Sequence, residues 1–386
     1  MPANTPIYNF PYPLGTDPVS QGDNDIRALA EDVETVISTN VATLTSSIPQ
    51  KNLLYNGAMQ VAQRGILASS LTTGGYQTAD RWLMSIGLNS GSWNQTVESD
   101  GPPGFAKSLK MARVSTGNSS DTLLYISQKL EGQDVQGLKK GTSEAEDFRV
   151  SFWAKSNVVG TYICQVYDTN NFRTVSQAYT ITTVDTWEYK SLTFSGDTSG
   201  PIVSNNAASI EVRFWLAAGS NYAGGSLNTT WSAFVANQQA TGQINVSLTV
   251  GGYWQMTGAM LSIGTTVGPF EHKAYGQELN ECQRYYQQYE SGGSDRTIMS
   301  GTMYQTGSPI FSLRYPVMRN APTINFNTGT YDIVGPNVVT TGTSVSASNI
   351  TTTTAQVGAG VGTSIAAGSG VLLRIDSGYY SMYSEL

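Results

Sequence analysis

The chain has few of the side chains that bind metals or form disulfides. Among its 386 residues there are two cysteines, Cys164 and Cys282, and one histidine, His272. A four-cysteine zinc site, a disulfide framework and a multi-histidine metal site within one chain are therefore excluded. We expect both cysteines to be buried free thiols and His272 to be a structural hydrogen-bonding residue. We predict no metal and no other cofactor.

Charge is also scarce, and long apolar runs are absent. Charged residues make up 13% of the chain, and 21 basic against 28 acidic side chains give a net charge of −7. Nucleic acids and anionic membranes bind basic surfaces, so neither is an expected partner. No segment approaches the roughly 20 apolar residues of a membrane helix. Because no basic region with an apolar run opens the sequence, we expect no signal peptide and no membrane insertion.

The abundant residues suit β structure. The chain has 40 glycines and 21 tyrosines, together with many serines and threonines. This composition is typical of β-rich extracellular or virion proteins rather than helical cytosolic enzymes. A chain of this length can form two or three domains with a sizeable core.

Prolines set the conformation of the first 20 residues. They are Pro2, Pro6, Pro11, Pro13 and Pro18. Each removes a backbone donor and fixes φ, so residues 1–20 are predicted to form an extended arm. Such an arm is either disordered or docked onto a partner. Its candidate virion-anchoring side chains are Tyr8, Phe10, Tyr12 and Leu14.

Residues 21–50 are predicted to form a helix used for oligomerisation or attachment. Apolar side chains recur at steps of three and four from about Asp25 onward, and Asp23 or Asn24 is the expected cap. The candidate seam positions are Ile26, Leu29, Val33, Ile37, Val41 and Leu44. We interpret this stripe as the seam of a three-stranded coiled coil. The alternative is an amphipathic helix that lies on its own chain's domain.

From Lys51 onward the apolar pattern changes to a period of two. Residues 149–154, 162–166, 210–216 and 244–250 alternate between apolar and polar side chains, with Gly-, Asn- and Ser-rich turns between such segments. Half-buried strands separated by turns predict a jelly-roll β-sandwich over 51–290. A short helix over 276–290 is expected to end it.

The last part of the chain is unusually poor in charge. After a predicted linker at 291–295, residues 325–370 contain a single charged side chain, Asp332. A disordered low-complexity tail is one interpretation. The β-branched content and an expected strand at 371–375 favour the other, a small ordered β domain over 291–386.

Several short motifs resemble a domain common in bacteriophage tail-fibre and related virion proteins. They are NLLYNGAM at 52–59, QRG at 63–65, ADRW at 79–82, FRVSFWAKS at 148–156, WEY at 187–189, TF at 193–194, TGAMLSIG at 257–264, GPFEH at 268–272 and GQELNECQRYY at 276–286. The segment PVMRNAPT at 316–323 resembles the start of the small β domain that often follows. Residues 11–18 and 25–29 resemble N-terminal anchoring segments of phage fibres.

The resemblance implies a jelly-roll domain, similar to a carbohydrate-binding module, inside a homotrimeric virion appendage. It implies no catalytic residues, and it supplies no fixed set of binding residues. Segments 100–147 and 325–370 match none of these motifs. We expect receptor preference to lie in such segments.

Other motifs carry weak chemical signals. The glycine-rich segment 358–362 lacks a following Lys-Ser or Lys-Thr and is interpreted as a turn rather than a phosphate loop. Asp168 with Asn170 and Asn171 would suit a calcium loop, although no EF-hand pattern is present. The neighbouring acids, which a glycosidase would use as a pair, are interpreted as solvated surface. They are Glu98 with Asp100, Glu144 with Glu146 and Asp147, and Glu278 with Glu281.

The aromatic residues offer a binding chemistry. Sugars stack their apolar faces on exposed aromatic rings, and nearby amides and carboxylates bind their hydroxyls. Trp93, Tyr222 and Trp231 lie in turn-like stretches and are the candidate glycan contacts. Trp153, Trp215 and Trp254 lie in expected strands, either in the core or on a sheet surface. The alternative is that every one of these rings is core or subunit interface.

Three functions from different classes fit these observations. The favoured one is a non-enzymatic tail fibre or other receptor-binding appendage of a phage virion, assembled in the bacterial cytoplasm. It would be a homotrimer that contacts other tail or capsid proteins through residues 1–50 and binds host cell-surface glycans. The second is a capsid-decorating or tail-adaptor protein with the same fold. The third is a polysaccharide-depolymerising tailspike.

Overall fold

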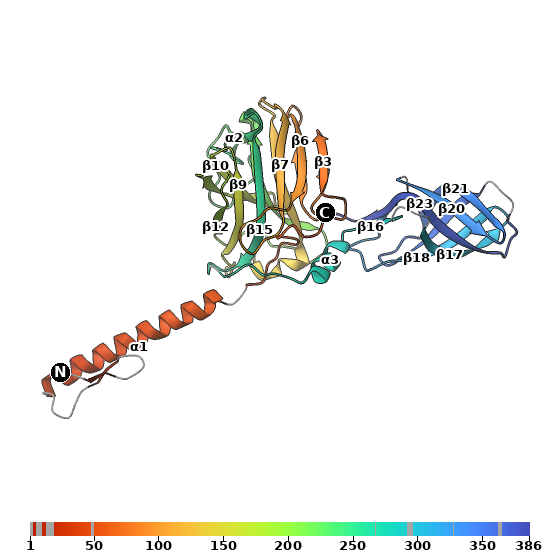
Figure 1. The fold of residues 1–386 in the computed structure, drawn as a ribbon. Coiled ribbons are helices and arrows are strands. Elements are labelled where there is room, and N and C mark those ends of the chain that lie inside the picture. Colours follow the sequence, from red (N-terminus) through yellow and green to blue (C-terminus); the bar gives the residue numbers. More distant parts are fainter. Residues whose placement is uncertain are drawn as a thin grey trace. The chain divides into compact units, whose positions relative to one another are not determined.

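The structure is a computed structural model, drawn as a ribbon in Figure 1. It describes residues 3–4, 10–12, 19–47, 50–266, 268–291, 296–326, 328–361 and 365–386. The chain divides into two compact units. One comprises Met1–Lys51 and Gly264–Glu271, and the other comprises Asn52–Ile263 and His272–Leu386. No helix in the described part of the chain is long and apolar enough to span a membrane.

The main element of the first unit is the helix α1 (Val19–Ser47), and two short strands, β1 (Ala3–Asn4) and β2 (Pro11–Tyr12), pair with each other. The helix begins earlier than predicted. Asp23 and Asn24 therefore lie inside it and do not cap it. The last proline of the N-terminal sequence is residue 18, and no proline follows before residue 49 to oppose a helix.

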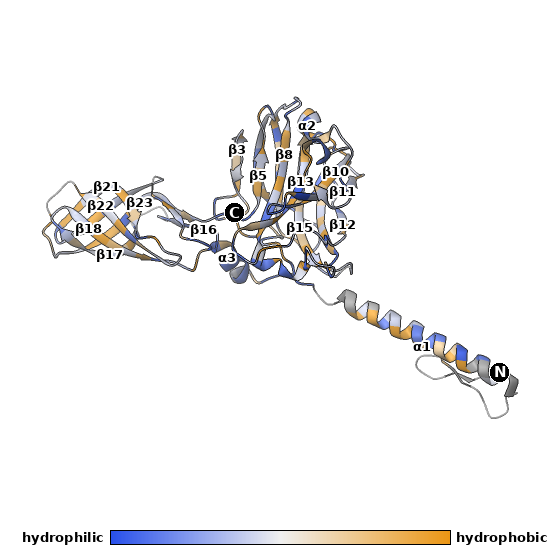
Figure 2. Cartoon of the chain, turned by 180° about the vertical axis from the view of Figure 1, so that it is seen from behind, coloured by the Kyte–Doolittle hydropathy of each residue, from blue (hydrophilic) through white to orange (hydrophobic). Residues whose placement is uncertain are grey.

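The predicted seam positions lie on a helix surface that is largely open in the single chain. Figure 2 shows apolar and polar residues interleaved along α1. Ile26, Ile37, Val41 and Leu44 are each more than half exposed, and Leu29 and Val33 are half-buried. Of the predicted anchor side chains, Tyr8 and Leu14 lie outside the described residues. Phe10 is half-buried, and Tyr12 belongs to β2.

The second unit contains a sandwich of two antiparallel sheets, as predicted. The seven-stranded sheet has the order β14 (Ser232–Ala233), β11 (Arg173–Ile181), β10 (Gly160–Asp168), β13 (Ala208–Ala218), β8 (Leu123–Glu131), β5 (Leu83–Ile86) and β4 (Gly75–Tyr76). The six-stranded sheet has the order β12 (Glu188–Phe194), β9 (Phe148–Ser156), β15 (Tyr253–Ile263), β7 (Ser108–Ser115), β6 (Ser92–Glu98) and β3 (Leu67–Leu71).

Aromatic rings fill the space between the two sheets. Phe214 of β13 contacts Trp82, Phe152 and Trp254, with ring centroids 4.9–6.1 Å apart. All four side chains are fully buried. The alternation at 149–154, 162–166 and 210–216 predicted these strands correctly, because in each strand one face meets this core.

Two predicted elements differ in the structure. Residues 244–250 form no strand. Instead Val246–Leu248 is a 3-10 turn (η4), in which the side chain of Asn245 accepts a hydrogen bond from the Ser247 amide at 3.0 Å. The predicted helix over 276–290 is also too long, because α3 (Tyr275–Gln283) ends early and β16 (Tyr286–Glu290) follows. The backbone of β16 pairs antiparallel with β23 (Gly370–Tyr383), so tertiary pairing overrides the helical spacing.

The C-terminal region is a six-stranded β-barrel. Its strands are β17 (Arg296–Gln305), β18 (Ser308–Arg314), β22 (Thr354–Val361), β21 (Val338–Ser348), β20 (Gly329–Gly335) and β23 (Gly370–Tyr383). The barrel closes because β23 pairs with both β17 and β20. The far end of β23 also pairs with β16 and with β19 (Thr323–Asn325). The charge-poor segment is therefore ordered β structure in its described residues, and the disordered tail is ruled out for them.

A buried cluster joins the barrel's last residues to the sandwich. The Glu385 carboxylate accepts from Arg81 Nη1 at 2.6 Å and from Arg64 Nη2 at 2.8 Å. The Arg81 guanidinium lies 3.5 Å from the centroid of the Tyr285 ring, and that of Arg64 lies 3.5 Å from the Tyr286 ring. Arg81 is fully buried. We call these five residues the junction cluster.

The NLLYNGAM motif at 52–59 supports the junction cluster through the hydrogen bonds of Asn56. The Asn56 side-chain amide donates to the backbone carbonyls of Val61 at 2.8 Å and Asp80 at 3.0 Å. The Trp82 indole donates to the backbone carbonyl of Asn56 at 3.0 Å, and the backbone N–H of Asn56 donates to the Glu278 carboxylate of α3. The motifs at 52–59, 63–65, 79–82 and 276–286 thus converge in space and serve the fold.

Glu385→Gln is expected to destabilise the second unit by about 3–5 kcal/mol, because it leaves the fully buried Arg81 guanidinium without a counter-charge and leaves Arg64 with the longer contact of 3.6 Å to Asp80. Urea unfolding measures this. Glu144→Gln is the control, since its side chain is 79% exposed and lies 3.9 Å from Lys139. The control should leave the midpoint unchanged. Equal midpoints for the two variants would contradict the importance of the junction cluster.

Candidate functional site

The outer face of the six-stranded sheet carries a group of aromatic rings. Along β9, Val150, Phe152 and Ala154 point into the core, so the residues between them point outward. Trp153 lies on this outer side and is half-buried, and its register partner on β12 is Tyr189. The two ring centroids are 5.4 Å apart, and Tyr189 is 41% exposed.

Trp187 extends this surface beyond the end of β12. The Lys155 ammonium lies 5.0 Å from its ring centroid, and its indole nitrogen donates to Asp100 at 3.4 Å. Asp100 also accepts from Lys155 and, at 3.1 Å, from the Gln255 amide. The hydrogen bond from Lys155 is the main reason why the pKa of Asp100 is lowered. A carboxylate, an ammonium and an amide are therefore fixed beside the indole ring.

Tyr253 of β15 completes the set. The Lys110 ammonium lies 4.6 Å from its ring, and its hydroxyl donates to Asp185 at 2.6 Å. Burial, with the help of that carboxylate, raises the pKa of the Tyr253 hydroxyl. We call Trp153, Trp187, Tyr189 and Tyr253 the aromatic face. It presents partly exposed rings for the apolar side of a sugar, with charged and amide groups in place for hydroxyls.

The three predicted glycan contacts do not belong to the aromatic face. Trp93 is fully buried, so its prediction as an exposed contact is wrong. It alternates inward with Gln95 and Val97 along β6, and its indole donates to the Ser90 carbonyl at 2.9 Å. Tyr222 is half-buried against Trp215, with centroids 5.8 Å apart.

Trp231, the third predicted contact, lines a cavity of about 270 Å³ at one edge of the sandwich. Its indole donates to the Ser195 carbonyl at 2.8 Å. Arg173 in the same cavity makes two hydrogen bonds to Asp197, at 2.7 and 2.9 Å. Among the described residues that line this cavity Trp231 is the single aromatic ring, whereas the aromatic face has four.

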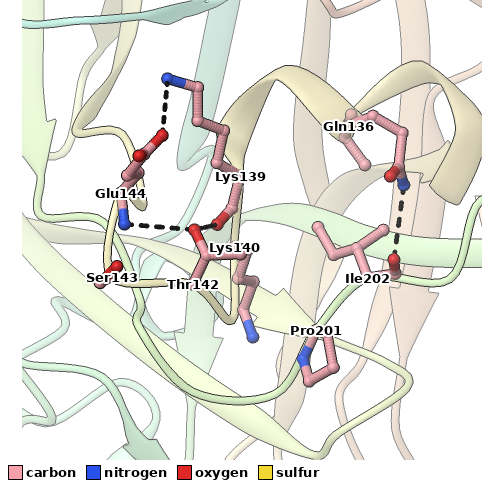
Figure 3. Close-up of a pocket in the computed structure, with 9 residues that line it drawn as sticks. Gln136, Lys139, Lys140, Thr142, Ser143, Glu144, Pro201 and Ile202 are labelled. Carbon is pink, nitrogen blue, oxygen red and sulfur yellow. Dashed lines mark hydrogen bonds and ion pairs between the residues drawn. The ribbon is translucent and has the colours of Figure 1, made fainter.

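A larger cavity, of about 500 Å³, lies nearby and is drawn in Figure 3. The described residues that line it include no aromatic ring. Its polar groups also pair with one another: Lys139 lies 3.9 Å from Glu144, and the Thr142 hydroxyl donates to the Lys139 carbonyl at 2.7 Å. The chemistry of the cavity is therefore less suited to sugar stacking than that of the aromatic face.

The Lys140 ammonium lies beside Asp168, in the loop that the sequence suggests for calcium. The buried Lys140 ammonium lies 2.5 Å from an Asp168 oxygen and 3.0 Å from an Asp197 oxygen. The other Asp168 oxygen accepts from the amides of Asn170 and Asn171. The calcium interpretation is therefore wrong for this loop, because the protein supplies its own cation. Within the described part of the chain, no group of three His, Cys, Asp or Glu residues is placed to hold a metal.

The remaining polar candidates have structural surroundings. Cys164 and Cys282 are buried free thiols, as predicted, and burial raises the pKa of both. The His272 ring packs against Phe105, with centroids 5.1 Å apart.

The aromatic face itself was missed by the sequence predictions. The strand pattern leaves Trp153 open between core and surface, and Trp187 and Tyr189 are named only among the residues that resemble phage fibre domains. One signal was present. Trp153 alternates in phase with Arg149 and Ser151, and out of phase with the apolar residues of the same strand. That phase places it on the polar, outer side of the sheet.

Comparisons with known proteins found no matching family model and no matching curated protein. Solved structures that match part of this chain include the enzymatically active domain of bacteriophage CBA120 tailspike protein 4, with 15% identity, 55% of this chain covered and a TM-score of 0.32. This chain spans only 21% of that tailspike structure.

Other matches include TmCBM61 in complex with β-1,4-galactotriose and a putative sugar-binding protein from Bacteroides thetaiotaomicron. Their identities are 11% and 13%, and their TM-scores are 0.30 and 0.31. In each case 55% of this chain is covered, with 99% and 100% of the other chain. The chain is thus distantly similar in structure to carbohydrate-binding modules and to a phage tailspike domain.

Lys140→Met is expected to destabilise the second unit by about 3–5 kcal/mol, because it leaves the buried carboxylates of Asp168 and Asp197 facing each other. The neighbouring Lys139→Met is the matched control, since that side chain is 47% exposed and should tolerate the change. Thermal unfolding of both variants measures the difference. Equal melting temperatures for the two variants would contradict the role of Lys140 as the cation of this loop.

Proposed function

We propose that this protein is a non-enzymatic, receptor-binding component of a phage virion and that its aromatic face binds host cell-surface glycans. The observation that carries the proposal is the set of four partly exposed rings on one outer sheet face. Stacking requires an accessible ring, and specificity requires polar groups fixed beside it. Asp100, Lys155 and Gln255 supply such groups.

The helix α1 suits the homotrimer that such an appendage would form. Ile26 is 61% exposed and Ile37 is 57% exposed, and they lie on the same helix face as the other seam positions. Three chains that bury this stripe against one another remove apolar surface from water. A trimer also carries three aromatic faces, so weak single sites gain strength on a cell surface dense in glycans. Residues 1–50 would join the trimer to other virion proteins.

Trp187→Ala combined with Tyr189→Ala is expected to weaken glycan binding by about tenfold or more, because two stacking surfaces are lost. Binding is measured on an array of bacterial capsular and O-antigen polysaccharides. Phe172→Ala is the matched control, since this ring is 64% exposed but lies on the β10–β11 turn of the other sheet. An equal loss of glycan binding in the control would show that binding does not depend on the aromatic face.

Two further measurements test the two other functions. Release of reducing sugar from a bound polysaccharide would show a depolymerising tailspike. A wild-type protein that binds no glycan but labels the capsid of purified virions would be a decorating protein. Either result would overturn the proposal.

Ile26→Asp combined with Ile37→Asp is expected to convert a trimer of three times 41.3 kDa into monomers, because charge on the seam opposes its burial. Light scattering measures the mass. Thr35→Asp combined with Ser38→Asp places the same charges on the opposite helix face and should leave the trimer intact. A monomeric wild-type protein at micromolar concentration is incompatible with the trimeric appendage.

A further inference from the structure

One arginine on the outer face of the six-stranded sheet stands apart from the chain's other buried arginines. Arg149 lies on β9, four residues before Trp153 and on the same side of the strand. It is 7% exposed. Its register partners are Thr193 on the edge strand β12 and Ser262 on β15. Arg149 therefore shares its surface with the aromatic face.

The guanidinium of Arg149 lacks the counter-charge that the other buried arginines have. Arg81 pairs with Glu385, and Arg213 pairs with Glu211, both at 2.6 Å. Among the described residues no carboxylate lies within 4 Å of Arg149. Burying an unpaired cation is costly, so an anion at this position would be strongly favoured.

Hydrogen-bonding capacity is also unused here. Nε and Nη1 of Arg149 are buried without an acceptor, and the hydroxyl of its cross-strand partner Ser262 is buried without any partner in the described chain. Among the described residues, Nη2 is the one guanidinium nitrogen of Arg149 with a hydrogen bond, a long one of 3.5 Å to the Thr193 hydroxyl. Thr193, whose hydroxyl Nη2 contacts, is exposed on the edge strand β12.

The edge strand links this cation to the aromatic rings. Tyr189, Ser191 and Thr193 of β12 are all exposed and alternate with less exposed residues. At roughly 3.3 Å per residue, Tyr189 and Thr193 lie about 13 Å apart along the strand. A polysaccharide that stacks on Trp153 and Tyr189 can follow this row of hydroxyls as far as Arg149.

We propose that the glycan recognised by the aromatic face is acidic and that Arg149, assisted by Ser262, binds its carboxylate. Resting on the proposed function, this inference names the ligand class. A planar guanidinium whose Nε and Nη1 have no acceptor among the described residues can bind a carboxylate in a bidentate arrangement, which the spherical ammonium of a lysine cannot reproduce. A uronic acid-type sugar supplies that group beside ring faces that can stack.

The test uses the full-length protein and a panel of hexuronic acid-containing bacterial polysaccharides, each paired with the same polymer after chemical reduction of its carboxyls to hydroxymethyl groups. Wild-type protein is expected to bind acidic polymers about tenfold more tightly than their reduced forms. Arg149→Met should abolish that preference while retaining the affinity for the reduced forms. Arg149→Lys keeps the charge but should recover only part of the preference.

Controls separate this inference from the proposed function. Trp187→Ala with Tyr189→Ala should weaken binding of acidic and reduced polymers alike. Ser262→Ala, a mild change, gives a second readout if Arg149→Met does not fold, and it should lower the acidic preference. Equal binding of acidic and reduced polymers by the wild type would overturn the acidic ligand and leave glycan binding intact. Binding of neither would overturn both. Loss of the trimer in Arg149→Met with unchanged acidic preference would assign the cation to a contact between chains.

Discussion

The Glu385 carboxylate is the contact on which the second unit depends. It neutralises two arginines, Arg81 and Arg64, that are stacked on consecutive tyrosines at the start of β16. The carboxylate comes from the end of the barrel, the arginines from the opening of the sandwich, and the tyrosines from the segment between them. Removing any one component leaves a buried charge or an open ring face, so the three segments stabilise one another. Burial raises the pKa of the adjacent Asp80 to about 6 against the opposing effect of Arg64, which reflects how little water reaches the cluster.

This cluster explains why the most specific motifs of the sequence say little about a ligand. The residues that resemble phage fibre domains include Arg64, Arg81 and Tyr285, and in the structure they hold segments of the chain together. Asn56 and Glu278 serve the same purpose through backbone hydrogen bonds. A motif that closes a domain is constrained by the packing of the segments that it joins. The surface that faces a ligand is free of that constraint, so recognising the motif predicts the architecture and leaves the binding residues open.

The sequence predicted the architecture well and the binding residues poorly, for a geometric reason. Alternation identifies a strand but assigns its faces only when the two sets of side chains differ clearly in polarity. In β9 they differ, and Trp153 falls with Arg149 on the outer side. In β6 the inward set contains Gln95 with Trp93 and Val97. Trp93 also lies next to Ser92 and Asn94, so the stretch resembled a turn and the buried Trp93 was predicted to be exposed. The segment 244–250 alternates as well, yet the Asn245 side chain stabilises a turn there. Pattern alone does not distinguish a strand from a turn of alternating residues.

The net charge of −7 repels an acidic ligand at long range. This repulsion is screened by salt. Specific binding depends on which cations remain uncompensated at the surface that a ligand touches. Lys155 is paired with Asp100, and Lys110 lies 4.0 Å from Glu98, so these cations have little charge left to offer. Arg149 retains its charge because no carboxylate in the described chain approaches it. One fixed cation beside stacking rings cannot hold the dense phosphates of a nucleic acid, which require many contacts. It is sufficient for a polymer that carries one carboxylate at intervals between neutral sugars. A composition that argues against a nucleic-acid partner is therefore compatible with an acidic glycan.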